Sequence, residues 1–204
     1  GLYINSNHVI VLDNRQVAEK YAAVFESSFQ YLNAHPKPSL SAITGSADFE
    51  RWHHFGLHGL PGMDISFAPH SAKRAEAILD DMNKRIRQAK ESVLFAVMSL
   101  ASNTSGPLVS TLRDLHQDAH IFSYGITDKY DGVMLYKPGS VRGLLVDTTR
   151  LQKKLPPPFS VELGTSAHKV HHKFVIVDFK SIDAVVYCGS SNLALLGEEQ
   201  NGDN

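Results

Sequence analysis

The sequence predicts an α/β fold with a mainly parallel, mixed sheet flanked by helices. Between residues 64 and 124, short runs rich in β-branched and aromatic residues alternate with longer runs whose apolar residues recur at helical spacing. The run SVLFAVMSL, residues 92–100, is apolar along almost its whole length, which is typical of a strand buried on both faces of a parallel sheet. Strands that alternate with helices in this way favour βαβ units.

The first expected helix covers residues 14–33. It follows the β-rich run HVIVL, Asp13 and Asn14 are suitable N-caps, and the apolar residues recur every three or four positions. Glycine and proline then interrupt every pattern over residues 34–62, which we expect to be a linker. The remainder, residues 63–204, is the expected main domain, and residues 1–33 belong to a separate preceding unit.

Within the main domain the apolar spacing predicts two further helices and several strands. Pro107 suits the first turn of the second of these helices. The expected helices cover residues 71–90 and 107–118, and the expected strands cover residues 64–68, 92–100, 120–124, 133–136, 144–146, 170–179 and 184–188.

Composition excludes several classes of protein. With 43% hydrophobic and 20% charged residues, the chain has the balance of a soluble globular protein, for which a cytoplasmic location is favoured. A net charge of −1 gives no overall basic footprint for nucleic acid. The single cysteine, Cys188, excludes an internal disulfide and a cysteine-based zinc cluster. No apolar run approaches the ~20 residues that span a bilayer.

The residues with chemical potential lie near the C-terminus, in the segment HHKFVIVD. On a strand, His171 and Lys173 project from one face and His172 from the other. Two basic groups at the head of an apolar run are costly to desolvate without an anionic partner. A phosphate would supply that partner, with lysine as a point charge and histidine as a nucleophile or proton donor.

A second polar segment, GSSN, follows the next expected strand. Gly189 permits a tight turn, and Ser190 and Asn192 offer short polar groups that bind oxygen atoms.

Together these two segments resemble the signature of the phospholipase D superfamily, H-x-K-x4-D followed by G-S-x-N. The resemblance covers residues 60–204 and implies that superfamily's fold. The spacer between the two parts is longer than the family usually has, which we attribute to a longer hairpin. The positions that carry the match are His171, Lys173, Asp178, Gly189, Ser190 and Asn192.

The resemblance also implies an acidic residue that orients the catalytic histidine through its far ring nitrogen. Asp203, which precedes an asparagine, matches that position, and Glu198 or Glu199 are the alternatives. Asp178 has the opposite strand parity to His171, so it is a candidate either for direct catalysis or for structural support.

In such enzymes one histidine attacks phosphorus to form a phosphohistidine, and a second protonates the leaving group. The resemblance therefore implies a phosphodiesterase, either a nuclease or a phospholipase, that needs neither a metal nor another cofactor. It also implies a second motif, from the same full-length chain or from a homodimer partner. The alternative function is a non-catalytic phosphate-binding or scaffold domain with the same fold.

The beginning of the chain resembles the end of a repeat of this family, with a strand followed by a helix. We therefore expect this chain to be part of a longer tandem protein in which His171 belongs to the second motif, and a one-motif enzyme that dimerises is the alternative. Ser6 stands where the repeat would carry its acidic residue, which departs from the family pattern. The family's usual division of labour would make His171 the acid, although the attacking role stays open.

Other basic residues are weaker candidates. His172 is expected to pack or to lie at the surface on the opposite face, and His168 and Lys169 are possible rim residues. The remaining cluster, His53, His54 and His58, has spacings sometimes seen in metal sites, but it stands in a glycine-interrupted stretch, so surface loop histidines are the better interpretation.

Overall fold

The computed structural model describes residues 7–34, 46–98, 107–129, 132–137, 144–147 and 170–200. The chain divides into two compact units, and each is considered by itself. The first comprises residues 1–8 and 79–194, and the second comprises residues 9–78 and 195–204. The α/β class is as expected.

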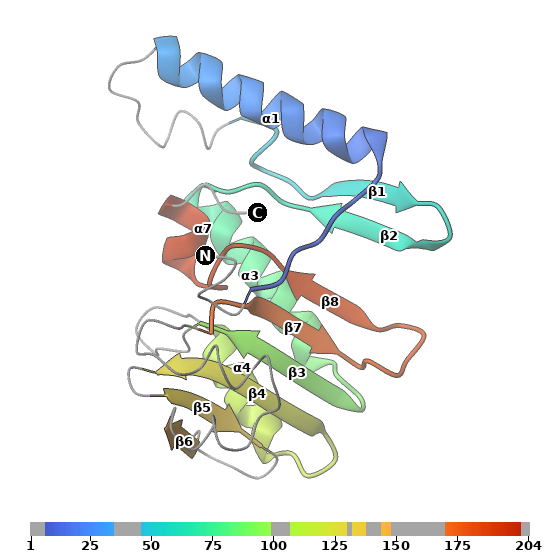
Figure 1. The fold of residues 1–204 in the computed structure, drawn as a ribbon, viewed down its shortest axis with the longest axis vertical. Helices are drawn as coiled ribbons and strands as arrows, with labels where there is room; N and C mark the ends of the chain where they lie inside the picture. The colour runs from blue at the N-terminus through green and yellow to red at the C-terminus, as the bar shows by residue number, and fades with distance from the viewer. Residues whose placement is uncertain are drawn as a thin grey trace. The chain divides into compact units, whose positions relative to one another are not determined.

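The first unit is built on a six-stranded sheet with the order β6-β5-β4-β3-β7-β8 (Figure 1). Its helix α4 spans Pro107–Gln117 and connects β3 to β4. The strands are β3 (Ser92–Val97), β4 (Phe122–Lys129), β5 (Gly132–Tyr136), β6 (Leu144–Asp147), β7 (Lys173–Val177) and β8 (Val185–Cys188).

The expectation of a mainly parallel sheet is wrong. In the described part of the sheet only β3 and β4 pair in parallel, joined by α4 as a βαβ unit. The pairs β4–β5, β5–β6, β3–β7 and β7–β8 are antiparallel. The short connections after β4 and β7 allow only antiparallel return, because a parallel crossover needs a dozen or more residues. The expected strand at residues 64–68 does not join this sheet.

One face of the sheet is buried beneath helical residues. Val93, Val97 and Val177 on this face are at most 1% exposed, and Leu112 of α4 is 1% exposed. Folding removes the apolar area of these residues from water, which stabilises the unit.

An aromatic cluster on the sheet requires a glycine. The ring of Phe95 lies directly over Gly125, where an added Cβ would approach the ring to 2.0 Å. Phe95 also packs against His116 of α4 and Tyr136 of β5, with ring centroids 5.7 and 5.5 Å away. Gly125 therefore makes room for a cluster that joins β3, β4, β5 and α4.

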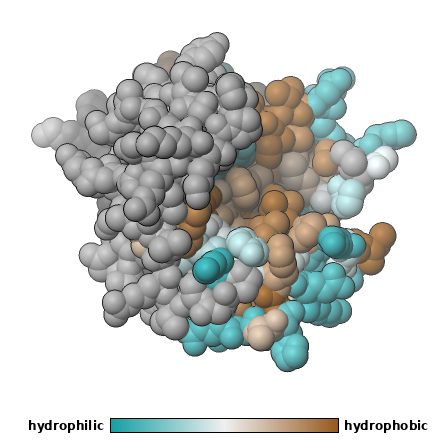
Figure 2. Space-filling model, turned by 60° about the horizontal axis from the view of Figure 1, so that its bottom comes forward, coloured by the Kyte–Doolittle hydropathy of each residue, from teal (hydrophilic) through white to brown (hydrophobic). Residues whose placement is uncertain are grey.

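Apolar side chains also reach the surface of this unit. The ring of Phe122 contacts those of Tyr124 and Phe179. These three residues are 42–51% exposed, and Val186 is 57% exposed. In the space-filling view, hydrophobic residues gather in a patch with hydrophilic residues beside it (Figure 2).

The second unit contains α1 (Arg15–Ala34), an antiparallel hairpin of β1 (His53–Leu57) and β2 (Leu60–Ile65), and α7 (Leu195–Gln200). Helix α3 (Ala72–Arg87) contributes to both units. The apolar residues that hold the second unit together form one buried cluster, Val17, Phe49, Phe55, Ile65 and Phe67.

Two local expectations can be compared with this unit. Of the two expected cap residues, Asn14 caps α1, since its Oδ1 accepts the backbone N–H of Val17 at 3.1 Å. The linker expected over residues 34–62 is wrong for its last ten residues, which contain β1 and the first half of β2. The glycines of this stretch predicted a loop, but Gly59, with φ of 72°, lies in the tight turn that joins β1 to β2.

Candidate active site

The two polar segments lie side by side at one end of the sheet. Lys173 begins β7 and pairs with Val97 at the carboxyl end of β3. Gly189 follows β8, and its backbone N–H donates to the carbonyl oxygen of Lys173 at 3.3 Å. The carboxyl ends of the parallel pair β3–β4 also meet there, which is where α/β sheets commonly bind ligands.

Lys173 is almost fully buried. The burial pattern of β7 places it on the same face as Val175 and Val177, with 3% of the residue exposed. Its Nζ donates to the backbone carbonyl oxygen of His171 at 2.8 Å. His171 precedes β7, so strand parity does not relate it to Lys173; the lysine instead reaches back along the chain to it.

His171 is half-buried and has a defined partner for one ring nitrogen. Its Nδ1 lies 2.9 Å from Oδ1 of Asn7. With the amide oxygen of Asn7 as the acceptor, Nδ1 carries the hydrogen, and the neutral ring then has its lone pair on Nε2. Burial lowers the pKa of His171, the charge of Lys173 lowers it further, and the carboxylate of Asp128 partly opposes both. The ring is therefore biased toward its neutral form.

Asn7 and Asp128 are the residues that sequence reasoning missed. Asp128 lies near the carboxyl end of β4, and its Oδ1 accepts the backbone N–H of Val170 at 3.0 Å. It thereby holds the chain just before His171. Asp128 could have been proposed as a site residue because it is acidic and lies at the carboxyl end of a strand, where α/β sheets commonly bind ligands. Asn7 had no such signal, because it is 164 positions away from His171.

His172 packs against neighbouring rings, in agreement with the expectation that it is a packing residue. Its ring stacks on His8 with centroids 5.6 Å apart and meets Phe174 at 5.5 Å. Burial lowers the pKa of His172, and the neighbouring His8, Lys173 and His171 lower it further.

The serines and asparagine of the second segment differ in exposure. Ser190 is exposed, whereas Asn192 is half-buried. The Oδ1 atom of Asn192 is buried and has no hydrogen-bond partner among the described residues. Ser191 is buried, and its Oγ accepts the backbone N–H of Leu193 at 3.1 Å, which stabilises the turn. Whether the side chains of Ser190 and Asn192 converge with His171 stays a prediction.

Asp178 lies at the opposite end of β7 from Lys173. Its carboxylate is buried and accepts three consecutive backbone N–H groups, those of Lys90, Glu91 and Ser92, at 2.9–3.2 Å. Burial alone would raise the pKa of Asp178, but these hydrogen bonds and the nearby charge of Arg85 lower it overall. Of the two roles considered for Asp178, these contacts agree with structural support.

Three other candidate residues, Asp203, His168 and Lys169, lie outside the described residues. Glu198, the alternative partner for the histidine, is buried in the second unit. Its Oε2 lies 3.4 Å from Nε2 of His70, and its carbonyl oxygen accepts the backbone N–H of His70 at 2.7 Å.

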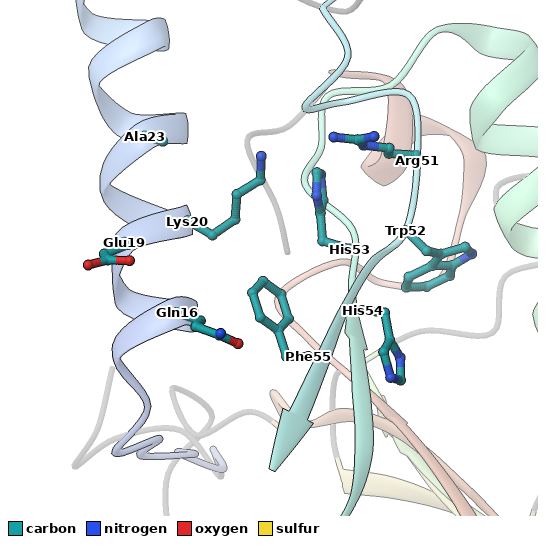
Figure 3. Close-up of a pocket in the computed structure, with 9 residues that line it drawn as sticks. All are labelled: Gln16, Glu19, Lys20, Ala23, Arg51, Trp52, His53, His54 and Phe55. Atoms are coloured by element: carbon teal, nitrogen blue, oxygen red, sulfur yellow. The ribbon is translucent and has the colours of Figure 1, made fainter.

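A separate groove of about 480 Å³ lies in the second unit between α1 and β1 (Figure 3). Two of its basic side chains are already paired, Lys20 with Asp48 and His54 with Asp64. The groove is lined by Gln16, Glu19, Lys20, Ala23, Arg51, Trp52, His53, His54 and Phe55.

The histidines of β1 do not gather around one point. His53 is buried and contacts the carbonyl oxygen of Asp48 through Nε2 at 2.9 Å, whereas the exposed His54 lies on the other face of the strand. Across the described parts of the chain, no group of three or more His, Cys, Asp or Glu residues is placed to hold a metal ion. In the same residues, no helix is both long and apolar enough to cross a membrane.

Comparison with known proteins leaves the geometry as the basis for a functional assignment. No family model, curated protein or solved structure matches the chain.

Proposed function

We propose that the chain forms one half of a phospholipase D-like active site that hydrolyses or exchanges phosphodiester bonds. The observation that carries the proposal is the pairing of the two polar segments through Gly189 and Lys173, together with the bond from the Lys173 ammonium to the backbone carbonyl oxygen of His171. These contacts support the proposal that the imidazole of His171 and the ammonium of Lys173 would neutralise an anionic phosphate at this end of the sheet. The finer fold, that of the phospholipase D superfamily, is part of the same proposal.

The chemistry follows from the groups present. In the attacking role, the Nε2 lone pair of His171 forms a bond to phosphorus while the ester P–O bond breaks. The departing oxygen keeps the electron pair and takes a proton from the imidazolium of a second His-Lys motif, in the same full-length chain or a homodimer partner. Water or an alcohol then gives a proton to the second histidine, now neutral, and attacks phosphorus, so that the P–N bond to His171 breaks. Lys173 and the polar groups of the turn would stabilise the charge that develops on the phosphoryl oxygens.

A second candidate function has one observation in its favour. The Lys173 ammonium is buried and donates to the backbone carbonyl oxygen of His171. That contact stabilises the local chain without any substrate, as expected of a non-catalytic phosphate-binding or scaffold domain. Both functions imply that the site binds phosphate, but only the phosphodiesterase turns over a substrate.

The test compares His171 with His120, an exposed histidine of the same unit. The chain and the full-length protein are assayed with a chromogenic phosphodiester, single-stranded DNA and phosphatidylcholine vesicles. We expect His171→Ala to lower turnover by about a thousandfold or more, and His120→Ala, the control, to change it far less. A phosphoryl group trapped on His171 would identify the intermediate.

The outcomes separate the candidates. If phosphate shifts the His171 NMR signals but the full-length protein shows no turnover, the scaffold function replaces the enzyme. If phosphate leaves His171 unaffected and His171→Ala retains full activity, both functions are wrong. Preference among the three substrates decides between a nuclease and a phospholipase.

A further inference from the structure

Two consecutive residues near the start of the chain contact two consecutive residues of the candidate site. Asn7 bonds to His171, and His8 stacks on His172. The ring of His8 also meets Phe174 edge-on at 5.9 Å. The pair therefore anchors residues 7 and 8 next to the start of β7, and the stacking of His8 holds its neighbour Asn7 in place.

The chemical nature of the Asn7 side chain matters for the histidine it contacts. A carboxylate at this position would fix the ring and also stabilise the imidazolium by its charge. An amide oxygen fixes the ring and the tautomer in the same way but carries no charge. Asn7 therefore orients His171 without favouring its protonated form.

The other charged and titratable groups near the ring do not replace that missing charge. Lys173 disfavours the imidazolium, and His8 and His172 add no negative charge. Asp128 favours the imidazolium, but its Oδ1 is engaged by the backbone of Val170. Within the described residues, the balance of charges around His171 does not favour protonation.

We infer that Asn7 is a positioning residue that holds His171 as the Nδ1–H tautomer through a neutral acceptor, so that the Nε2 lone pair is presented for attack. This inference rests on the proposed function and deepens it. It assigns His171 the attacking role, whereas the family's usual division would make it the acid. The proton for the departing oxygen then comes from the second motif.

The test is NMR spectroscopy of the histidine rings in ¹⁵N-labelled chain, with Asn7→Asp, Asn7→Leu and wild type. In the wild type, Nδ1 of His171 is expected to carry the hydrogen at neutral pH. Asn7→Asp should keep that tautomer and raise the pKa of His171 by about 1–2 units, because it places a negative charge at hydrogen-bond distance. Asn7→Leu should abolish the preference for Nδ1–H.

Asn33→Asp is the matched control, because it makes the same change of charge at an exposed position of α1. It should leave the titration of His171 unchanged. In active protein, the acid limb of the kcat/KM profile should move to higher pH in Asn7→Asp by the same amount as the pKa.

Two results would overturn the inference. One is a wild-type His171 whose hydrogen sits on Nε2, which is measurable even if the variants do not fold. The other is a pKa that responds equally to Asn7→Asp and Asn33→Asp. These spectra can be recorded on a protein without turnover. If the protein is inactive but Asn7→Asp raises the pKa of His171, the proposed function is contradicted and the positioning role of Asn7 is retained.

Discussion

Asp178 and Ser92, 86 positions apart, bind each other in both directions: the N–H of Asp178 donates to the carbonyl oxygen of Ser92 at 2.8 Å, and the N–H of Ser92 donates to Oδ1 of Asp178 at 3.1 Å. A third bond joins the N–H of Phe179 to Oγ of Ser92 at 3.2 Å. Asp178 has φ of 53°, a conformation that aspartate and asparagine tolerate better than most residues. These hydrogen bonds join the C-terminal end of β7 to the first residue of β3.

We therefore predict that Asp178→Ala destabilises the chain by about 2–4 kcal/mol, because it removes the acceptor of three backbone N–H groups, of which that of Ser92 is buried. Asp178→Asn should cost less, since its amide oxygen still accepts and its φ preference is similar. The measurement is chemical denaturation at neutral pH, with exposed Asp183→Ala as the control. A destabilisation no larger than that of Asp183→Ala would show that this contact is dispensable.

The lowered pKa of Asp178 adds a pH dependence to this prediction. Its folded-state pKa lies below its unfolded value of ~3.9, so its contribution is present above that pH and is lost as the pH falls through the folded pKa. The difference in stability between wild type and Asp178→Ala should therefore shrink in strong acid. A difference that stayed constant would argue against a role for the charge.

Gly125→Ala tests the aromatic cluster. The new Cβ would lie 2.0 Å from the ring of Phe95, which also packs against His116 and Tyr136. Overpacking of this kind typically costs about 1–3 kcal/mol. Gly56→Ala in β1 is the control, because nothing lies within 4 Å of its added Cβ. Equal thermal stability of the two variants would show that the ring moves aside freely.

His116 should make the chain sensitive to mild acid. It is buried, neither ring nitrogen has a hydrogen-bond partner in the described part of the chain, and burial lowers its pKa. The unfolded chain then binds more protons than the folded one below pH ~6.5, so stability falls as the pH drops toward the folded pKa, by at most ~1.4 kcal/mol per pH unit from this group.

The variant that checks this is His116→Phe, which keeps a ring against Tyr136 but cannot be protonated. Its stability should fall less than that of wild type between pH 7 and pH 5, as measured by urea denaturation. Exposed His120→Gln should follow the wild-type curve. If His116→Phe and wild type lose stability in parallel, the acid sensitivity belongs to other groups.

Turnover, where it is found, should not depend on a divalent metal. The proposed step uses an imidazole and an ammonium, which supply the nucleophile and the positive charge that a metal would otherwise provide. We expect the rate with the chromogenic phosphodiester to be unchanged after dialysis against chelator. Loss of activity with chelator and its return with added metal would contradict the phosphohistidine mechanism.

The sequence by itself determined the local features that depend on neighbouring residues. The periodicity of α1 and its Asn14 cap, the apolar runs of β3 and β7, and the glycine after β8 all have local physical causes, and the structure bears them out. The residue types of the His171 and Gly189 segments likewise indicated a candidate site before any fold was known.

Tertiary structure decided which strands pair and which distant residues meet. An apolar run shows that a strand is buried but not the direction of its neighbours, so the mainly parallel sheet was wrong. Strand parity also failed for His171, because β7 begins only at Lys173. The bond from Asn7 to His171 joins residues 164 positions apart, and such a contact depends on the path of the whole chain rather than on any local preference.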